Sequence, residues 1–333
     1  MQKKIIALAV AAAFSAPAFA ADVSVYGIVD AAITNTSKTG MKSQMNLTSG
    51  GLSTSRLGVK ATEGLDNGWT AIALLEYKLD VADATSTLAS PRQKMLAVAG
   101  DFGTVAAGYL QTTGYDFSGK YQPFAGSAVD PYTSANPTAF ITTASRAPRA
   151  VAYISPDING LTFAYNHTFD AAGTATLVTN GATTGNVTTA NLLSVNYDQG
   201  PLSVGGVYVS TANDNAGYAA VTETGLGATY DLGAAKVMGT YLTTKASGGN
   251  SDKMINASVV APVGPGTLVF GYAKNTKDST AAADNTSAFT IAFLKGMSKT
   301  VTAYGAIEKV STEAGAAATT DTTVLAVGLR KKF

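Results

Sequence analysis

The feature that most constrains this chain is a regular alternation of short and long connections between similar segments. About sixteen stretches of roughly ten residues alternate apolar with small or polar side chains, as strands with one lipid-facing side do. Seven connections are tight turns built on Gly, Pro, Asn or Asp, which accept the backbone angles of a sharp reversal. These turns lie at residues 64–68, 100–103, 157–160, 198–201, 231–233, 263–266 and 296–299.

Eight longer connections separate these turns. They lie near residues 37–54, 80–91, 113–148, 171–189, 212–217, 246–252, 278–286 and 311–322. Seven turns and eight loops join sixteen strands, an even number, so both chain ends fall on the side of the short turns. The pattern predicts an all-β fold, a closed 16-stranded antiparallel transmembrane β-barrel whose ends face the periplasm.

The N-terminus reads as an export signal. Lys3 and Lys4 precede an apolar stretch over residues 5–14, and Ala18-Phe19-Ala20 offers a small-residue cleavage site. We expect residues 1–20 to be a cleavable signal peptide and residues 21–333 to form the barrel. No later stretch reaches the roughly 18 consecutive apolar residues of a membrane-spanning helix.

Composition argues against several other functions. The chain has 23 basic and 22 acidic residues, and loss of Lys3 and Lys4 with the leader leaves a net charge near −1, which argues against nucleic acid as a partner. Cysteine is absent and no His or carboxylate cluster has ligand spacing, so neither a metal site nor a cofactor is expected. The single histidine, His167, shares the strand face of Phe163 and Tyr165, and we predict no enzymatic activity.

Strand parity separates the two faces of the predicted wall. In residues 69–79 the uncharged positions alternate with Glu76 and Lys78, and in residues 56–60 Arg56 and Lys60 oppose Leu57. A basic residue on the lipid face near the midplane costs about 2–4 kcal/mol, so the charged face is expected to line the lumen. Aromatic residues at the strand ends predict interfacial girdles. The candidates are Tyr26, Trp69, Tyr77, Phe163, Tyr165, Tyr197, Tyr230, Tyr241, Tyr272, Phe293 and Phe333.

Sixteen strands enclose an aqueous channel, so another element must set its width. The third loop, residues 113–148, is far too long for an ordinary hairpin and is rich in Tyr and Phe. Aromatic side chains are poorly suited to free solvent, which favours a loop folded into the barrel. The alternative is an extracellular loop packed on its neighbours.

Charged residues near this loop are the candidate pore-lining and constriction residues. They are Arg56, Lys60, Glu76, Lys78, Arg92, Lys94, Asp116, Lys120, Asp130, Arg146 and Arg149. By parity Arg92 and Lys94 share one face, and Glu76 is a candidate to offset Lys78. Basic residues outnumber acidic ones in this set, which predicts a mild preference for anions because fixed charges in a pore concentrate counter-ions. The alternative is that each charge is solvated and has a structural partner.

Several ordered motifs resemble the general porins of the Gram-negative outer membrane, in their β-proteobacterial branch. The motifs lie at residues 25–31, 55–63, 75–77, 103–105, 153–156, 294–300 and 327–333. The resemblance implies a homotrimer of barrels in outer-membrane lipid, each with a pore for small hydrophilic solutes and ions that is narrowed by the third loop. It also implies that the outer-membrane assembly machinery reads the terminal Phe333.

One departure from that family concerns the fifth strand. Gly108-Tyr109-Leu110 stands where the family usually has Gly-Arg-Gln, so one usual pore arginine is missing. A general diffusion channel is the leading interpretation, followed by a substrate-specific channel and by a surface receptor or adhesion barrel. Aromatic side chains stacked along the path would favour the second, and the candidates are Tyr109, Tyr115, Phe117 and Tyr121.

Overall fold

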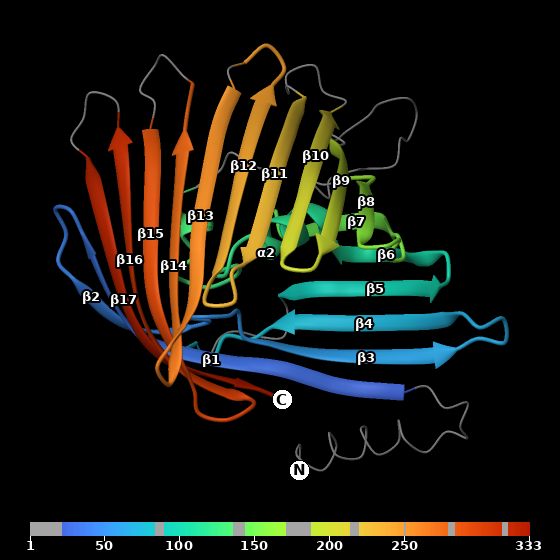
Figure 1. Ribbon diagram of the computed structural model, residues 1–333, viewed down its shortest axis with the longest axis horizontal. Helices are drawn as coiled ribbons and strands as arrows, with labels where there is room; N and C mark the ends of the chain where they lie inside the picture. The colour runs from blue at the N-terminus through green and yellow to red at the C-terminus, as the bar shows by residue number, and fades with distance from the viewer. Residues whose placement is uncertain are drawn as a thin grey trace, which may run out of the picture.

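The computed structural model describes eight stretches of the chain. They are residues 22–83, 90–135, 144–170, 188–213, 220–249, 251–278, 284–314 and 319–333. The expected signal peptide lies outside the described residues, as do parts of several expected loops, including residues 136–143 of the third loop. Nearly all of the described chain is β-structure in one curved sheet (Figure 1).

Seventeen strands form this sheet, and each pairs with its neighbours in antiparallel fashion. They are β1 (Asp22–Lys38), β2 (Gln44–Ser49), β3 (Arg56–Gly64), β4 (Thr70–Lys78), β5 (Pro91–Gly100), β6 (Gly103–Gln111), β7 (Arg146–Ile154), β8 (Leu161–Thr168), β9 (Thr188–Gln199), β10 (Leu202–Asn213), β11 (Val221–Asp231), β12 (Lys236–Ala246), β13 (Ser251–Val263), β14 (Gly266–Thr276), β15 (Asp284–Gly296), β16 (Val301–Ala314) and β17 (Thr320–Lys332). The sheet closes because β1 also pairs with β17, over residues 28–38 of β1.

Two of the labelled strands occupy one position in the wall. β1 pairs with β2 over residues 31–36 and with β3 over residues 22–28, so β2 and β3 are two halves of one interrupted barrel strand. The barrel therefore has sixteen strand positions, which confirms the predicted fold. The expected first loop, residues 37–54, is wrong in its extent, because the chain reverses within residues 39–43 and β2 already belongs to the wall.

All seven predicted tight turns join consecutive strands. In the turn between β7 and β8, Asn159 and Gly160 both have positive φ, at 55° and 87°, and this backbone shape allows so short a reversal. Among the residues described, no helix is both long and apolar enough to span a membrane.

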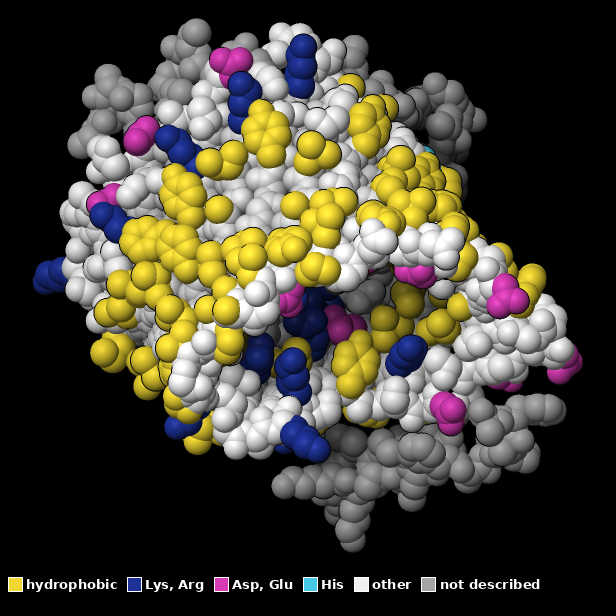
Figure 2. Space-filling view, in the orientation of Figure 1, with side chains coloured by type: hydrophobic (Ala, Val, Ile, Leu, Met, Phe, Trp, Pro, Cys, Tyr) yellow, Lys and Arg dark blue, Asp and Glu magenta, His cyan; other side chains and the backbone are white. Residues whose placement is uncertain are grey.

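The predicted alternation of faces holds along the clearest strands. On β17, Leu325, Val327 and Leu329 are exposed on the outer wall, whereas Ala326 is buried on the lumen side. On β14, Leu268 and Phe270 are exposed and Val269 is buried. Figure 2 shows the result as apolar side chains spread over the outside of the wall around a hollow interior.

The third loop folds into the barrel, as predicted. Two helices lie in its described residues, α2 (Thr113–Lys120) and α3 (Pro131–Ala135). Inside the barrel α2 contacts β8, β9 and β10 (Figure 1), and α3 contacts β14, β15 and β16. Four loop aromatics are buried almost completely: Phe117, Tyr121, Phe124 and Tyr132. Burial of a large apolar side chain contributes about 1.5–3 kcal/mol, so these rings hold the loop against the wall.

Glycines in the wall make room for these rings. A Cβ added at Gly227 would lie 2.3 Å from the Tyr121 ring, and one at Gly271 would lie 2.9 Å from the Phe124 ring. At the start of α2, the Thr112 hydroxyl accepts a hydrogen bond from the Tyr115 backbone N–H at 3.0 Å, which caps the helix. The loop is thus seated by close packing on one part of the wall.

Candidate pore constriction

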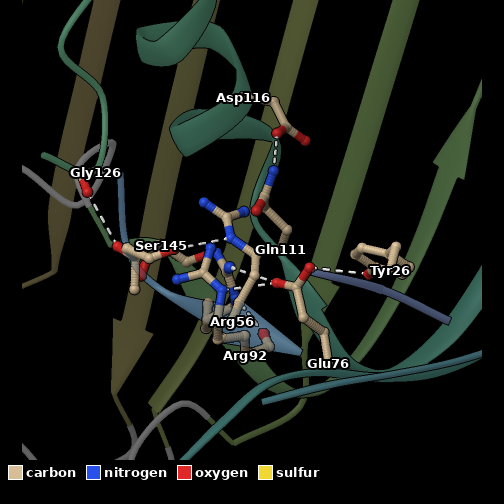
Figure 3. Close-up of polar contacts among 10 residues, drawn as sticks. Tyr26, Arg56, Glu76, Arg92, Gln111, Asp116, Gly126 and Ser145 are labelled. Carbon is tan, nitrogen blue, oxygen red and sulfur yellow. Dashed lines mark hydrogen bonds and ion pairs between the residues drawn. The ribbon is translucent and has the colours of Figure 1, made fainter. Parts of the chain in front are cut away.

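Three arginines from three strands converge on one carboxylate inside the barrel. Arg92 of β5 lies with its Nε 2.7 Å from Glu76 Oε1 on β4, and Arg146 of β7 approaches the same oxygen at 4.0 Å. The Tyr26 hydroxyl donates to Glu76 Oε2 at 2.9 Å (Figure 3). Glu76 is buried and its two oxygens are occupied by these partners.

Backbone contacts fix the other two guanidinium groups. Arg56 of β3 donates from Nε to the Thr54 carbonyl at 3.1 Å. Arg146 donates to the carbonyls of Arg92 and Ser145, and its guanidinium lies 5.7 Å from the centre of the Tyr115 ring. Three positive side chains therefore share one carboxylate, which leaves an excess of positive charge at this part of the lumen.

Asp116 brings negative charge from the loop to this region. It lies on α2 and accepts a hydrogen bond from the Gln111 amide (Figure 3). Desolvation inside the lumen raises the pKa of the Asp116 carboxyl, while Gln111 and the charge of Arg146 act in the opposite direction. Asp116 is the loop acid that stands beside the arginines.

Strand register places two of the three wall lysines on the lumen face. Lys60 and Lys78 lie opposite Leu74 and Arg56, so both face the lumen with Glu76. The sequence made Glu76 a candidate to offset the charge of Lys78. In the structure Glu76 pairs with Arg92 and Arg146 instead.

The expected lumen position of Lys94 is wrong. Lys94 lies opposite Leu75, which is exposed on the outer wall. The physical reason is a β-bulge: Tyr77 pairs with Pro91 and Glu76 with Gln93, which leaves Arg92 as an extra residue. The extra residue reverses the alternation, so Arg92 points to Glu76 while Lys94 faces outward.

Three other predicted residues do not join the arginines. Lys120 forms an ion pair with Asp198 of β9, Nζ to Oδ2 at 2.6 Å. Arg149, at a strand irregularity with a positive φ of 48°, pairs with Asp170 at 3.0 Å. The expectation that Lys120 faces the basic wall is therefore wrong, because the path of α2 carries it past β7 and β8 to β9.

Asp130 is also not a channel-facing charge. It is only 3% exposed and accepts hydrogen bonds from the Tyr132 backbone N–H at 3.1 Å and from the Thr133 hydroxyl at 2.9 Å. Burial raises the pKa of the Asp130 carboxyl to about 6, against those hydrogen bonds. The residue directly precedes α3, which packs against β14, β15 and β16 and not against the strands that carry the arginines.

The sequence did not identify Tyr26 as a pore residue. It was expected in the aromatic girdle, but its ring lies over Gly58, where an added Cβ would be 2.2 Å from Cζ, and its hydroxyl reaches Glu76. The register that pairs Tyr26 with Gly58 is the signal that would have revealed this, since an aromatic ring opposite a glycine has room to lie flat over it.

Comparison with known proteins agrees with this geometry. The sequence matches the Gram-negative porin family over residues 7–315. It is 30% identical to outer membrane porin protein 32 of Delftia acidovorans over 323 residues, which cover 92% of this chain and 88% of that protein.

Solved structures show the same fold. The anion-selective porin from Comamonas acidovorans superposes with a TM-score of 0.80 at 23% identity, covering 94% of this chain and all of that one. OmpT of Vibrio cholerae superposes with a TM-score of 0.68 at 14% identity, covering 96% of this chain and 99% of that one. With a closed barrel, an inward loop and a family match over most of its length, the chain belongs to the Gram-negative porins and is an outer-membrane diffusion channel.

Proposed function

We propose that this channel passes small hydrophilic solutes and ions passively, with a mild preference for anions. The observation that carries the proposal is the convergence of Arg56, Arg92 and Arg146 on a single Glu76 inside the lumen. Fixed charges between low-dielectric walls focus the field and raise the local concentration of counter-ions. An excess of guanidinium groups therefore favours anions at the narrow part of the path.

Two lysines support the same sign, and one loop acid opposes it. Lys60 and Lys78 add positive charge to the lumen face, whereas Asp116 places one carboxylate beside the arginines. Asp130 is buried against the opposite wall and contributes little to the field in the channel. The structural relative from Comamonas acidovorans is an anion-selective porin, which agrees with this proposal.

A substrate-specific channel is less well supported. Phe117 and Tyr121, two of the four candidate aromatics, are buried against the wall and cannot stack along a solute path. Tyr115 is the ring beneath Arg146, and Tyr109 lies opposite the outward-facing Lys94. A receptor or adhesion barrel is also less well supported, because the one very long loop folds into the lumen.

The test is the reversal potential of single channels in a salt gradient. The wild type should prefer anions, most strongly at low salt, because the screening length grows from about 3 Å at 1 M to about 30 Å at 0.01 M. Arg56→Gln should reduce this preference. Lys94→Gln is the matched control, since it removes one positive charge from the outer wall and should change the potential little. A wild-type pore selective for cations at low salt would contradict the proposed preference.

We also infer a homotrimeric assembly in outer-membrane lipid after cleavage of residues 1–20. A structure of Vibrio cholerae OmpT is described as a trimer form, which supports this arrangement by analogy. The mass of the complex in mild detergent tests it, and a species that is monomeric at all concentrations would contradict it.

His167 lies beside Asn191, with Nδ1 2.9 Å from Oδ1, and its ring packs edge-on against Phe169. We infer no catalytic role for this histidine.

Phe333 is our proposed assembly signal. Its backbone exchanges hydrogen bonds with Gly27 at 3.0 and 3.1 Å, and its exposed ring lies over that glycine. Phe333→Ala keeps the backbone bonds and removes the ring. This variant should lower the yield in the outer membrane far more than the stability of protein refolded in detergent, and equal losses in both would leave only a packing role.

A further inference from the structure

The interruption between β2 and β3 sends residues 50–55 out of the wall and into the lumen. Leu52 of this segment is 7% exposed and packs in one apolar cluster with Phe124 and Val129 of the third loop. Gly50 has a φ of +87°, which lets the chain leave the sheet. The 50–55 segment is therefore built into the space between the wall and the loop.

Asp30 lies on β1 where the interruption occurs. Below it β1 pairs with β3, and above it β1 pairs with β2. The backbone of Asp30 is satisfied by the 50–55 segment instead: its N–H donates to Ser55 Oγ at 2.9 Å, and its carbonyl accepts from the Gly50 N–H at 2.8 Å. The Ser55 hydroxyl donates to the same carbonyl at 3.0 Å.

The side chain of Asp30 also binds the segment. One carboxylate oxygen, Oδ2, accepts from the backbone N–H groups of Leu52 at 3.1 Å and Ser53 at 2.8 Å. The other, Oδ1, accepts from the Tyr304 hydroxyl of β16 at 2.5 Å. Asp30 is 0% exposed, so water cannot replace it at these donors.

The far side of the 50–55 segment holds the tip of the third loop. The Thr54 backbone N–H and hydroxyl both donate to the Gly126 carbonyl at 3.0 Å, and the Ala128 N–H donates to the carbonyls of Gly50 and Gly51 at 3.2 Å. The carbonyl of Thr54 in turn accepts from Arg56. One short segment thus contacts both the constriction loop and a pore arginine.

We propose that Asp30 is a positioning residue of the pore, acting through the 50–55 segment to set the place of the loop tip and of Arg56. Its carboxylate is the fixed point of the chain of contacts that runs from the wall through Leu52, Ser53 and Thr54 to Gly126. Asp30 is buried behind that segment and does not contact ions itself. It affects ion passage by fixing the positions of the loop tip and of Arg56. The part of this inference that concerns Arg56 rests on the proposed anion preference, whereas the part that concerns the loop tip does not.

The test compares two variants of equal charge, Asp30→Asn and Asp30→Ala. Asparagine retains an oxygen for the Leu52 and Ser53 N–H groups and an amide for Tyr304, which can accept instead of donate. Alanine leaves all three groups unpaired. In planar bilayers Asp30→Ala should show higher mean conductance, more open-channel current noise and a smaller anion shift of the reversal potential, and Asp30→Asn should restore most of each.

A milder pair of variants guards against misfolding of Asp30→Ala. Thr54→Val removes the hydroxyl that reaches Gly126 while keeping the backbone N–H, and Thr54→Ser keeps both. Thr54→Val should raise the current noise in the same direction as Asp30→Ala, and Thr54→Ser should match the wild type. Far-ultraviolet spectra and heat-modifiable gel mobility establish that each barrel is closed.

The outcomes separate the two proposals. If the wild type shows no anion preference but Asp30→Ala and Thr54→Val still raise conductance and noise, the proposed selectivity fails and the positioning role stands. If closed barrels carrying Asp30→Ala or Thr54→Val match their controls in conductance, noise and reversal potential, the positioning role is overturned.

Discussion

The two sides of the lumen wall differ sharply in what they present to the channel. The side formed by β3, β4, β5 and β7 carries three arginines around Glu76, with Tyr115 and Asp116 of α2 beside Arg146. The side formed by β8 to β10 and β14 to β16 is covered by α2 and α3, with aromatic rings pressed against glycines. One side therefore supplies the charge of the pore and the other supplies its narrowness.

This division explains why the loop carries few charges that matter for ions. Its acids and bases are used to seat it: Lys120 pairs with Asp198, and Asp130 is buried at the start of α3. Changes on the two sides should consequently have separable effects, on ion preference and on loop seating.

The largest effect is expected at the centre of the charged side. Glu76→Gln removes the carboxylate shared by Arg92 and Arg146, and breaking a buried ion pair by removing one partner costs about 3–5 kcal/mol. The barrel should be less stable to urea and the pore more selective for anions. Lys78→Gln, on the same face, serves as the control for a lumen substitution and should change stability little. Unchanged stability in Glu76→Gln would show that water screens the cluster.

On the loop side, Asp130 should make stability depend on pH. Its pKa in the folded protein is about 6, above the ordinary 3.8, so the folded state holds the proton more strongly. Stability from this group is fully present below about pH 4 and is lost as the pH rises through 6, a change of about 3 kcal/mol by linkage. Urea unfolding at several pH values measures this slope. Asp130→Asn should reduce this slope, and a slope equal to that of the wild type would contradict the assignment.

α2 should lose its close packing against the wall when a side chain is added at the glycine beneath the Tyr121 ring. Gly227→Ala places a Cβ 2.3 Å from the Tyr121 ring, and overpacking of this kind costs about 1–3 kcal/mol. We expect a displaced loop, seen as altered single-channel conductance, with little change in reversal potential. Gly206→Ala is the control, because the nearest atom there would lie 3.6 Å from the new Cβ. A normal conductance in Gly227→Ala would mean that the ring adapts without moving the loop.

The smallest effect is expected at the ion pair between Lys120 and Asp198. Both side chains are partly exposed, at 32% and 46%, and exposed pairs contribute no more than about 1 kcal/mol. Lys120→Gln should therefore lower stability slightly at low salt and not at high salt. A large change in ion selectivity would instead place Lys120 in the conducting path.

Much of the architecture could be predicted because the signals are periodic. Alternation along β17 and β14 fixed the faces of their side chains, and the turn residues located all seven tight reversals. The aromatic content of the third loop also indicated its burial, since rings such as Phe117 need an apolar surface. These features depend on local pattern, which a single sequence contains.

The details of the site depend on non-local geometry. The bulge at Arg92 reversed the face of Lys94, and no feature of residues 91–94 alone shows that an extra residue is present. The partners of Lys120 and Asp130 follow from the path of the loop across the lumen. Tyr26 was misplaced because its position depends on Gly58, a residue on another strand.

The contacts of Asp30 also constrain the order in which the molecule assembles. Tyr304, which donates to its carboxylate, is 274 positions away in the chain, and Arg330, which donates to Ser53 at 2.9 Å, belongs to the last strand. Both arrive beside β1 only when the seam between β1 and β17 closes. If Asp30 sets the loop tip as proposed, the finished pore width is among the last properties acquired during folding, and a barrel with an open seam lacks these contacts.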